Sequence, residues 1–168
     1  DFFFEEFMGH VEKTYRIKKE KRYRAVAGLS MGGEGTFISA LHHPELFSSA
    51  CPLSAATGPL SPEGAKDFLK RREISFSTDE EVNAYFRRYS VVDLINNMPD
   101  DQKKSVRWYI DCGDDDFLYE GNSLVHIAMK KKEIPHEFRI RDGGHTWTYW
   151  RTALPEVLEF ISSGFHQY

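Results

Sequence analysis

Hydrophobic residues recur along the chain with both the helical and the strand period, and the two patterns alternate. Phe3, Phe7 and Val11 belong to an apolar stripe at helical spacing, so residues 2–15 are predicted to form an amphipathic helix. Short apolar runs bounded by turn residues predict strands at residues 22–28, 47–53, 106–112 and 136–140. Helical patterns predict further helices between the first two strands and at residues 121–132 and 147–163.

The stretch at residues 54–104 has a different character. Its first part, residues 57–64, is rich in glycine, proline and serine and offers no strand. Helical fragments follow at about residues 64–71, 78–88 and 90–97. We interpret the stretch as a helical insertion over the carboxyl-terminal edge of the sheet, where it would form a lid or a wall of the substrate pocket.

The order of the predicted elements defines a fold class. Strands that alternate with helices are typical of an α/β protein, in which a parallel sheet carries helices on both faces. A chain of 168 residues is long enough for one such domain with a sizeable core. We therefore predict a single α/β domain over residues 1–168, with the helical insertion inside it.

The most informative motif is Gly28-Leu29-Ser30-Met31-Gly32, between the first predicted strand and the following helix. A Gly-x-Ser-x-Gly sequence in that context is the nucleophile elbow of α/β-hydrolases. The serine sits on a tight, strained turn, so the residues two before and two after it are expected to lack room for a side chain. The backbone N–H of the residue after the serine would then face the substrate carbonyl from a helix N-terminus. An ordinary glycine-rich turn is the alternative.

A serine nucleophile requires a base, and His145 is the candidate. It follows the last predicted strand in a glycine-containing loop, from which an imidazole can reach the elbow. The other histidines lie within or at the ends of predicted elements or in the tail: His10, His42, His43, His126, His136 and His166.

The acid that orients the base is expected in the loop after the third strand, because α/β-hydrolases supply serine, acid and histidine in that order. Asp111 is predicted to lie still within the strand. Spacing alone does not decide whether Asp114, Asp115 or Asp116 is this acid. For Asp114 and Asp115 the alternative role is to cap the helix that follows.

Charge and hydropathy argue against two classes of binding partner, nucleic acids and membranes. The net charge is −4 and the basic residues are dispersed, so no nucleic-acid partner is expected. No apolar run approaches the roughly 20 residues of a membrane span, so no membrane partner is expected. Cys51 and Cys112 are predicted to be buried thiols on neighbouring strands, with a disulfide as the alternative. The proposed chemistry calls for no metal and no organic cofactor. The run Asp114-Asp115-Asp116 is not expected to form a cation site, because three adjacent aspartates point in different directions.

Three blocks of the chain resemble the motifs of one family. They are Gly-Leu-Ser-Met-Gly-Gly at residues 28–33, Asp-Cys-Gly-Asp-Asp-Asp-Phe-Leu at residues 111–118 and Gly-Gly-His-Thr-Trp-Thr-Tyr-Trp at residues 143–150. Together they resemble the putative esterase family of α/β-hydrolases. That family includes S-formylglutathione hydrolases, mycolyltransferases, and the feruloyl and acetylxylan esterases of carbohydrate esterase family 1. The resemblance runs from about Phe3 to Phe160.

The resemblance implies a serine carboxylic ester hydrolase that works through an acyl-enzyme. Ser30 would be the nucleophile, His145 the base and Asp116 the acid, since the family's acid block Gly-Thr-x-Asp matches with the acid at that position. Asp114 stands where the family usually has threonine, a departure that concerns the local loop geometry. The N–H of Met31 and a second donor would form the oxyanion hole.

The resemblance also suggests substrates. Trp147 and Trp150 are more similar to the carbohydrate-ester and small-acyl branch, so feruloyl or acetyl esters of plant polysaccharides are the first expectation. Phe117 and Trp147 are expected to bind substrate. Of the four nearby aromatics, at least two are expected to be core residues instead: Phe117, Tyr119, Trp147 and Tyr149. The alternatives are acyl transfer to sugar hydroxyls, hydrolysis of small thioesters, and an inactive fragment that lacks half of the oxyanion hole.

The family's sheet is larger than this chain can build. The resemblance implies that the chain supplies roughly the last four strands, and that an N-terminal part of the fold lies outside it. That part would hold the strand beside residues 22–28 and the loop with the second oxyanion donor. The open strand edge would then favour pairing with the missing segment or self-association. The resemblance further favours a secreted or periplasmic location.

Overall fold

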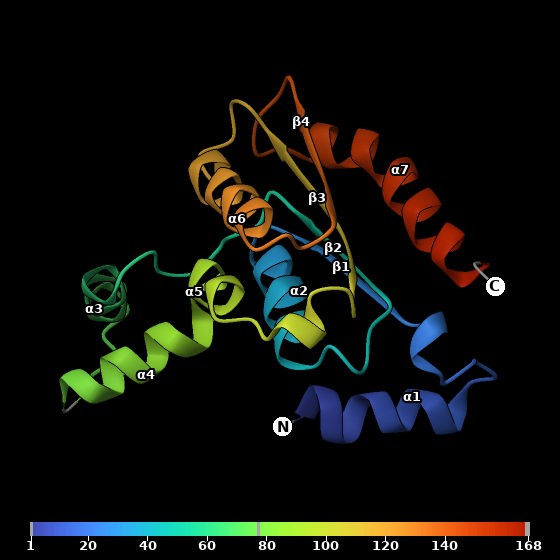
Figure 1. Cartoon of the computed structure of the whole chain (residues 1–168), viewed down its shortest axis with the longest axis horizontal. Coiled ribbons are helices and arrows are strands. Elements are labelled where there is room, and N and C mark those ends of the chain that lie inside the picture. Colours follow the sequence, from blue (N-terminus) through green and yellow to red (C-terminus); the bar gives the residue numbers. More distant parts are fainter. Residues whose placement is uncertain (1, 77, 167–168) are drawn as a thin grey trace.

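A computed structural model of the chain describes residues 2–76 and 78–166, and its centre is a four-stranded sheet. The strands are β1 (Ala25–Leu29), β2 (Ser49–Leu53), β3 (Arg107–Gly113) and β4 (His136–Arg141). All neighbouring strands are parallel and lie in sequence order, β1-β2-β3-β4 (Figure 1). Parallel pairing makes each connection cross back over the sheet. The carboxyl ends of all four strands therefore lie at the same end of the sheet.

Helices cover both faces of the sheet, as predicted. The three that pack on it are α2 (Met31–His42), α6 (Tyr119–Lys131) and α7 (Trp147–Phe165). α2 and α6 lie on one side of the strands and α7 on the other (Figure 1). Consecutive residues of β3 point to opposite faces: Trp108 stacks on Phe37 of α2, with ring centroids 5.7 Å apart, whereas Tyr109 packs with Val157 of α7. No helix in the described parts of the chain is long and apolar enough to cross a membrane.

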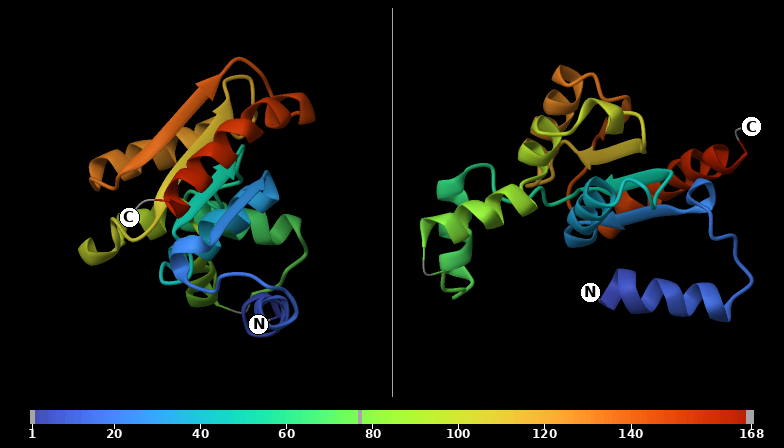
Figure 2. Two further views of the ribbon diagram at one scale, coloured as in Figure 1. Left: turned by 90° about the vertical axis from the view of Figure 1, so that its right-hand side faces the viewer. Right: turned by 60° about the horizontal axis from the view of Figure 1, so that its bottom comes forward.

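The segment between β2 and β3 is helical, as its sequence suggests. It contains α3 (Pro62–Arg71), α4 (Asp79–Tyr89), α5 (Val91–Asn96) and a short 3-10 helix, η3 (Asp100–Gln102). Ser61, Thr78 and Ser90 each begin an α-helix by accepting a backbone N–H with the side-chain hydroxyl. α3 and α4 extend away from the sheet and pack on each other, whereas α5 packs on α2 and α6 (Figures 1 and 2). The interpretation of this segment as a lid stays a prediction.

The N-terminal segment is helical but less regular than expected. A π-helix, η1 (Phe3–Phe7), continues into α1 (Met8–Thr14), which stands apart from the sheet (Figure 2). A 3-10 helix, η2 (Lys21–Tyr23), occupies residues expected to begin the first strand, so β1 starts later. Arg24 anchors this region by donating to Glu12 at 2.5 Å and to the carbonyl of Leu46 at 3.0 Å.

The sheet has two open edges within the described residues. β1 forms one edge and β4 the other, because the strand order follows the sequence. Four of the five residues of β1 are only partly buried, in contrast to the wholly buried β2. Pairing of the β1 edge with another segment stays a prediction.

The two cysteines are buried and unpaired. Cys51 lies on β2 and Cys112 on β3, as predicted, and the alternative of a disulfide is wrong. Burial raises the pKa of each thiol to about 12. The reactive form of cysteine is the thiolate, so neither residue is suited to be a nucleophile.

This burial leads to a prediction on reactivity. At pH 8 a thiol with a pKa near 12 is ionised to about one part in ten thousand, so iodoacetamide should leave the folded chain unmodified over an hour. In guanidinium chloride, intact mass should show two adducts. Rapid addition of even one adduct to the folded chain would contradict the burial of both thiols.

Candidate active site

Ser30 occupies a strained turn between β1 and α2. Its backbone dihedrals are φ 57° and ψ −119°, a region that residues with a side chain rarely adopt. The turn is held by the next strand, because the Ser30 N–H donates to the carbonyl of Leu53 at 3.0 Å and the Ser30 carbonyl accepts from Ala56 at 3.1 Å. The strained turn predicted from the motif is thus present.

The glycines around Ser30 have unequal roles. A Cβ on Gly28 would collide with the carbonyl of Gly32, and one on Gly33 would lie 2.7 Å from the Cβ of Ala55. A Cβ on Gly32 would meet nothing within 4 Å among the described residues. The expectation that the position two after the serine lacks room is therefore wrong. Gly32 crowds Gly28 through its carbonyl group and not at its own Cβ position, and the position without room for a side chain is Gly33.

Asp116 is the aspartate of the β3–α6 loop that faces the histidine. Its carboxylate is buried, and its Oδ1 also accepts the backbone N–H of Leu118 at 2.9 Å. Asp111 lies within β3, as expected. Asp114 and Asp115 do not cap α6, which begins at Tyr119 without a side-chain cap. The choice that spacing left open is thus made by the way the loop turns.

His145 bridges the serine and the aspartate. It lies in the loop between β4 and α7. Its Nε2 is 2.9 Å from Ser30 Oγ, and its Nδ1 is 2.9 Å from Asp116 Oδ2 and 3.0 Å from Oδ1. With the Nδ1 proton donated to the carboxylate, Nε2 is left to accept the serine proton. The three side chains that the sequence singled out come together in hydrogen-bonding order.

The two loops that carry Asp116 and His145 are joined to each other beyond the ends of their strands. The N–H of Asp114 donates to the carbonyl of Arg141 at 3.1 Å, and the N–H of Asp115 donates to the carbonyl of Gly143 at 3.1 Å. The Asp114 carboxylate in turn accepts the Gly143 N–H at 3.1 Å. The β3–β4 pairing therefore continues into the loops and keeps the aspartate near the histidine. This gives Asp114, the departure from the family pattern, a structural role.

Two aromatic rings contact the His145 imidazole. The Phe117 ring lies 4.6 Å from it, and Trp150 meets it at an angle of 87° with centroids 4.8 Å apart. Trp150 is itself held by a hydrogen bond of 2.9 Å from its Nε1 to Ser54 Oγ. Ser54 was missed in the sequence. Ser54 follows β2 with a positive φ of 42°, and this backbone conformation accompanies its contact with Trp150. A serine in the sequence does not indicate a positive φ, so the sequence offers no sign of this contact.

Most of the aromatics expected near the site are exposed. Phe117 is 76% and Trp147 63% exposed, and Tyr119 is also exposed, whereas Tyr149 is 5% exposed. The expectation that at least two of these four belong to the core is therefore wrong. The exposed three lie beyond the carboxyl ends of the strands, in the β3–α6 loop or in the first turn of a helix, where no described element covers them.

Met31 is the residue whose backbone N–H is expected to bind an oxyanion. It is the first residue of α2, directly after Ser30. The N–H groups of a helix's first turn have no acceptor within the helix, and the helix dipole favours negative charge there. This backbone N–H is therefore suited to bind an oxyanion next to the serine.

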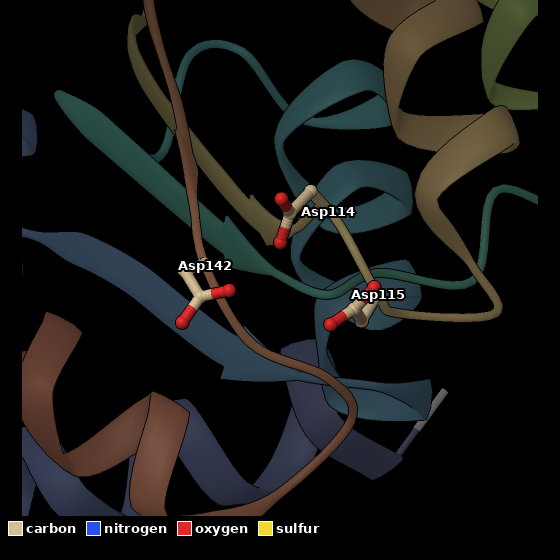
Figure 3. A group of neighbouring side chains, drawn as sticks. All are labelled: Asp114, Asp115 and Asp142. Carbon is tan, nitrogen blue, oxygen red and sulfur yellow. The ribbon is translucent and has the colours of Figure 1, made fainter.

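A cluster of acidic groups lies beside the joined loops. Figure 3 shows Asp114 and Asp115 on the loop after β3 and Asp142 next to them on the chain leaving β4. All three are exposed, with one carboxylate oxygen of each within 4.8 Å of the others. Asp116 is not part of this cluster, because it turns toward His145. One member already binds a backbone N–H, and exposed acidic groups of this kind are no metal site by themselves.

The fold and site define the class, which is that of the α/β-hydrolases. The family model of the putative esterases matches residues 1–161, so the chain belongs to the putative esterase family. This confirms the resemblance found in the three sequence motifs.

Individual relatives agree with this assignment. An acetyl esterase of Caldicellulosiruptor saccharolyticus is 24% identical over 181 positions, which cover 95% of this chain and 64% of the relative. A solved structure of a ferulic acid esterase superposes with a TM-score of 0.78 at 36% identity, covering 98% of this chain and 60% of that one. This chain thus spans about three fifths of the length of these relatives.

Less similar structures share the fold. An S-formylglutathione hydrolase from Agrobacterium tumefaciens superposes with a TM-score of 0.75 at 23% identity, covering 98% of this chain and 56% of that one. The fluorophosphonate-binding serine hydrolase FphF of Staphylococcus aureus gives a TM-score of 0.76, also at 23% identity, covering 95% of this chain and 62% of that one.

The unequal glycines lead to a prediction with a built-in control. Gly28→Ala should lower the free energy of unfolding by about 1–3 kcal/mol, because the added methyl group meets backbone that cannot move freely. Gly32→Ala should leave stability unchanged or raise it by up to about 1 kcal/mol, since alanine is the better helix former. Urea titration of both variants measures the difference. Equal destabilisation would contradict the geometry of the elbow.

Proposed function

We propose that this chain carries the catalytic centre of a serine carboxylic ester hydrolase. The observation that carries the proposal is the hydrogen-bonded series in which Ser30 Oγ, the His145 imidazole and the buried Asp116 carboxylate are each 2.9 Å from the next. Nucleophile, base and orienting acid in this order are the arrangement that activates a serine hydroxyl. Membership of an esterase family supports an ester as the substrate.

The proposed reaction has two steps. Ser30 Oγ attacks the ester carbonyl while His145 Nε2 takes its proton, and the tetrahedral oxyanion is bound by the N–H of Met31. The imidazolium then protonates the departing alcohol, and an acyl-enzyme remains on the serine. Water attacks this acyl-enzyme with His145 again as the base, which releases the acid. Asp116 holds the imidazole tautomer and stabilises its positive charge throughout.

The oxyanion hole needs a second donor. We propose that it comes from a part of the fold that the longer relatives possess and this chain does not span. Loss of one oxyanion donor typically costs about a hundredfold to a thousandfold in rate. The chain by itself should therefore react with a phosphonylating reagent but turn esters over slowly.

As substrates we propose feruloyl or acetyl esters of plant polysaccharides. The ferulic acid esterase at 36% identity and the acetyl esterase at 24% identity support this choice. The exposed rings of Phe117 and Trp147 offer apolar surface on which a flat acyl group or a sugar can stack. The S-formylglutathione hydrolase shares only the fold at its identity, so it does not favour thioesters.

The first prediction from this proposed function concerns Ser30. A fluorophosphonate should add once to the chain, and the adduct should map to this serine. Ser30→Ala should carry no adduct, and His145→Gln should label at least about a thousandfold more slowly, because the hydroxyl loses its base. Intact mass and peptide mapping measure both.

A folded parent chain that takes no adduct would contradict the proposal for this chain. The same labelling on a form extended at its N-terminus would show whether the missing part is required. Labelling of Ser30→Ala at the parent's rate would overturn the choice of nucleophile.

The second prediction concerns the exposed aromatics. Trp147→Ala should raise the KM for methyl ferulate about threefold to tenfold, the equivalent of one lost aromatic contact, and change the KM for propyl acetate much less. Phe2→Ala removes an exposed ring of the N-terminal segment and is the matched control. Equal effects on both esters would contradict a role of Trp147 in binding the aromatic acyl group.

A further inference from the structure

A second buried aspartate lies behind the candidate site. Asp111 is wholly buried near the end of β3, and the proposed reaction does not use it. Its Oδ1 accepts the hydroxyl of Tyr149 at 2.5 Å. Its Oδ2 accepts the hydroxyl of Tyr109 at 3.1 Å and also binds the guanidinium of Arg141. A buried carboxylate is costly unless it is paired in this way.

The pairing extends from β3 to β4 and α7. Arg141, the last residue of β4, also donates to Glu156 of α7 at 2.5 Å. Burial opposes its charge, but the hydrogen bond that Arg141 donates to the Tyr109 hydroxyl and the negative charge of Asp111 outweigh this and raise the pKa of Arg141. Burial and the hydrogen bond to Asp111 likewise raise the pKa of Tyr149, so its hydroxyl remains a donor. Further out, Arg139 Nε lies 4.0 Å from Glu156.

Tyr149 connects this network to the histidine loop. It lies in the first turn of α7, where its N–H is capped by Thr146 Oγ1 at 3.3 Å. Its ring lies so close to the chain after β4 that a Cβ on Gly143 would be 2.9 Å from Cδ2. A Cβ on Gly113, at the end of β3, would be 3.3 Å from Cε2 of the same ring. The ring therefore supports the junction of the two loops that carry Asp116 and His145.

We propose that Asp111, through Tyr149, is a positioning residue for His145. The inference rests on the proposed function, since it assigns a role in holding the base. Asp111 anchors the Tyr149 hydroxyl and the Arg141 guanidinium, one on each side of the histidine loop. The loop is thereby held at both of its ends, and the imidazole stays within reach of both of its partners. Asp111 itself touches no reacting atom.

The two tyrosines offer a matched test, because each donates a hydroxyl to the same carboxylate. Tyr109 lies on β3 and makes the larger number of bonds, since its hydroxyl also contacts Glu156 at 3.0 Å and accepts from Arg141 at 3.1 Å. Apart from the chain neighbours of Gly143, the three heavy atoms nearest to a Cβ on this glycine all belong to Tyr149 and none to Tyr109. Tyr109→Phe should therefore cost at least as much stability as Tyr149→Phe and yet leave the histidine in place.

Kinetics supply the first readout, on this chain and on a form extended at its N-terminus. Tyr149→Phe should lower kcat about tenfold with KM changed less than about twofold, as expected when a hydrogen bond to a charged group is lost and the base is loosened. Tyr109→Phe should keep kcat within about twofold of the parent. Equal losses of kcat in the two variants, or no loss in Tyr149→Phe, would overturn the proposal.

The second readout does not depend on activity. The Nδ1 proton that His145 shares with Asp116 should give a low-field proton resonance, which His145→Gln removes. In Tyr149→Phe its exchange with water should be about tenfold faster, while in Tyr109→Phe it should match the parent. A parent chain that takes no fluorophosphonate but shows this difference would refute the proposed function and leave the positioning role standing. An unchanged resonance in Tyr149→Phe would refute the positioning role alone.

A third variant covers the case in which Tyr149→Phe does not fold. Arg141→Lys keeps the positive charge beside Asp111 but cannot bind the Asp111 and Glu156 carboxylates together, so it loosens the β4 end of the same loop. It should accelerate exchange of the His145 proton in the same direction. A folded Arg141→Lys variant with parental exchange and kcat would overturn the proposal.

Discussion

The pairing of β3 with β4, continued into the loops beyond them, is the constraint on which the candidate site depends. Two backbone hydrogen bonds and the Asp114 carboxylate join the loop of Asp116 to the loop of His145. Hydrogen bonds to Asp116 and Ser30 tolerate shifts of only a few tenths of an ångström. Independent loops would rarely hold such distances, whereas loops joined as one ladder hold them as long as the sheet is intact.

The elbow adds the third side chain by a different device. Ser30 is held in a strained conformation by backbone hydrogen bonds to Leu53 at the end of β2 and to Ala56 just after it, and the carbonyl of Gly32 leaves no room for a Cβ on Gly28. Strain of this kind persists only where the surroundings compensate for it. The sheet therefore positions the serine through β1 and β2, and the aspartate and histidine through β3 and β4.

The polar network around Asp111 contains a buried carboxylate that takes no part in the proposed reaction. It links β3, β4 and α7 behind the site, with donors for both carboxylate oxygens. Its outer end is exposed to solvent, where such pairs contribute little to stability. We propose that the buried part of the network, around Asp111, fixes the direction of the loop that carries His145. Apolar packing alone would define that direction less sharply.

The sequence by itself determined the parallel α/β fold, the helical segment between β2 and β3, and Ser30 and His145 as the residues of interest, because each depends on local periodicity or on a motif. It left three aspartates open, since spacing does not say which way a loop turns. It misjudged Gly32 and the exposed aromatics, because the room around a side chain depends on which distant segment lies next to it. Only the tertiary structure revealed Ser54, the joined loops and the Asp111 network, whose partners are brought together by the sheet and not by their order in the chain.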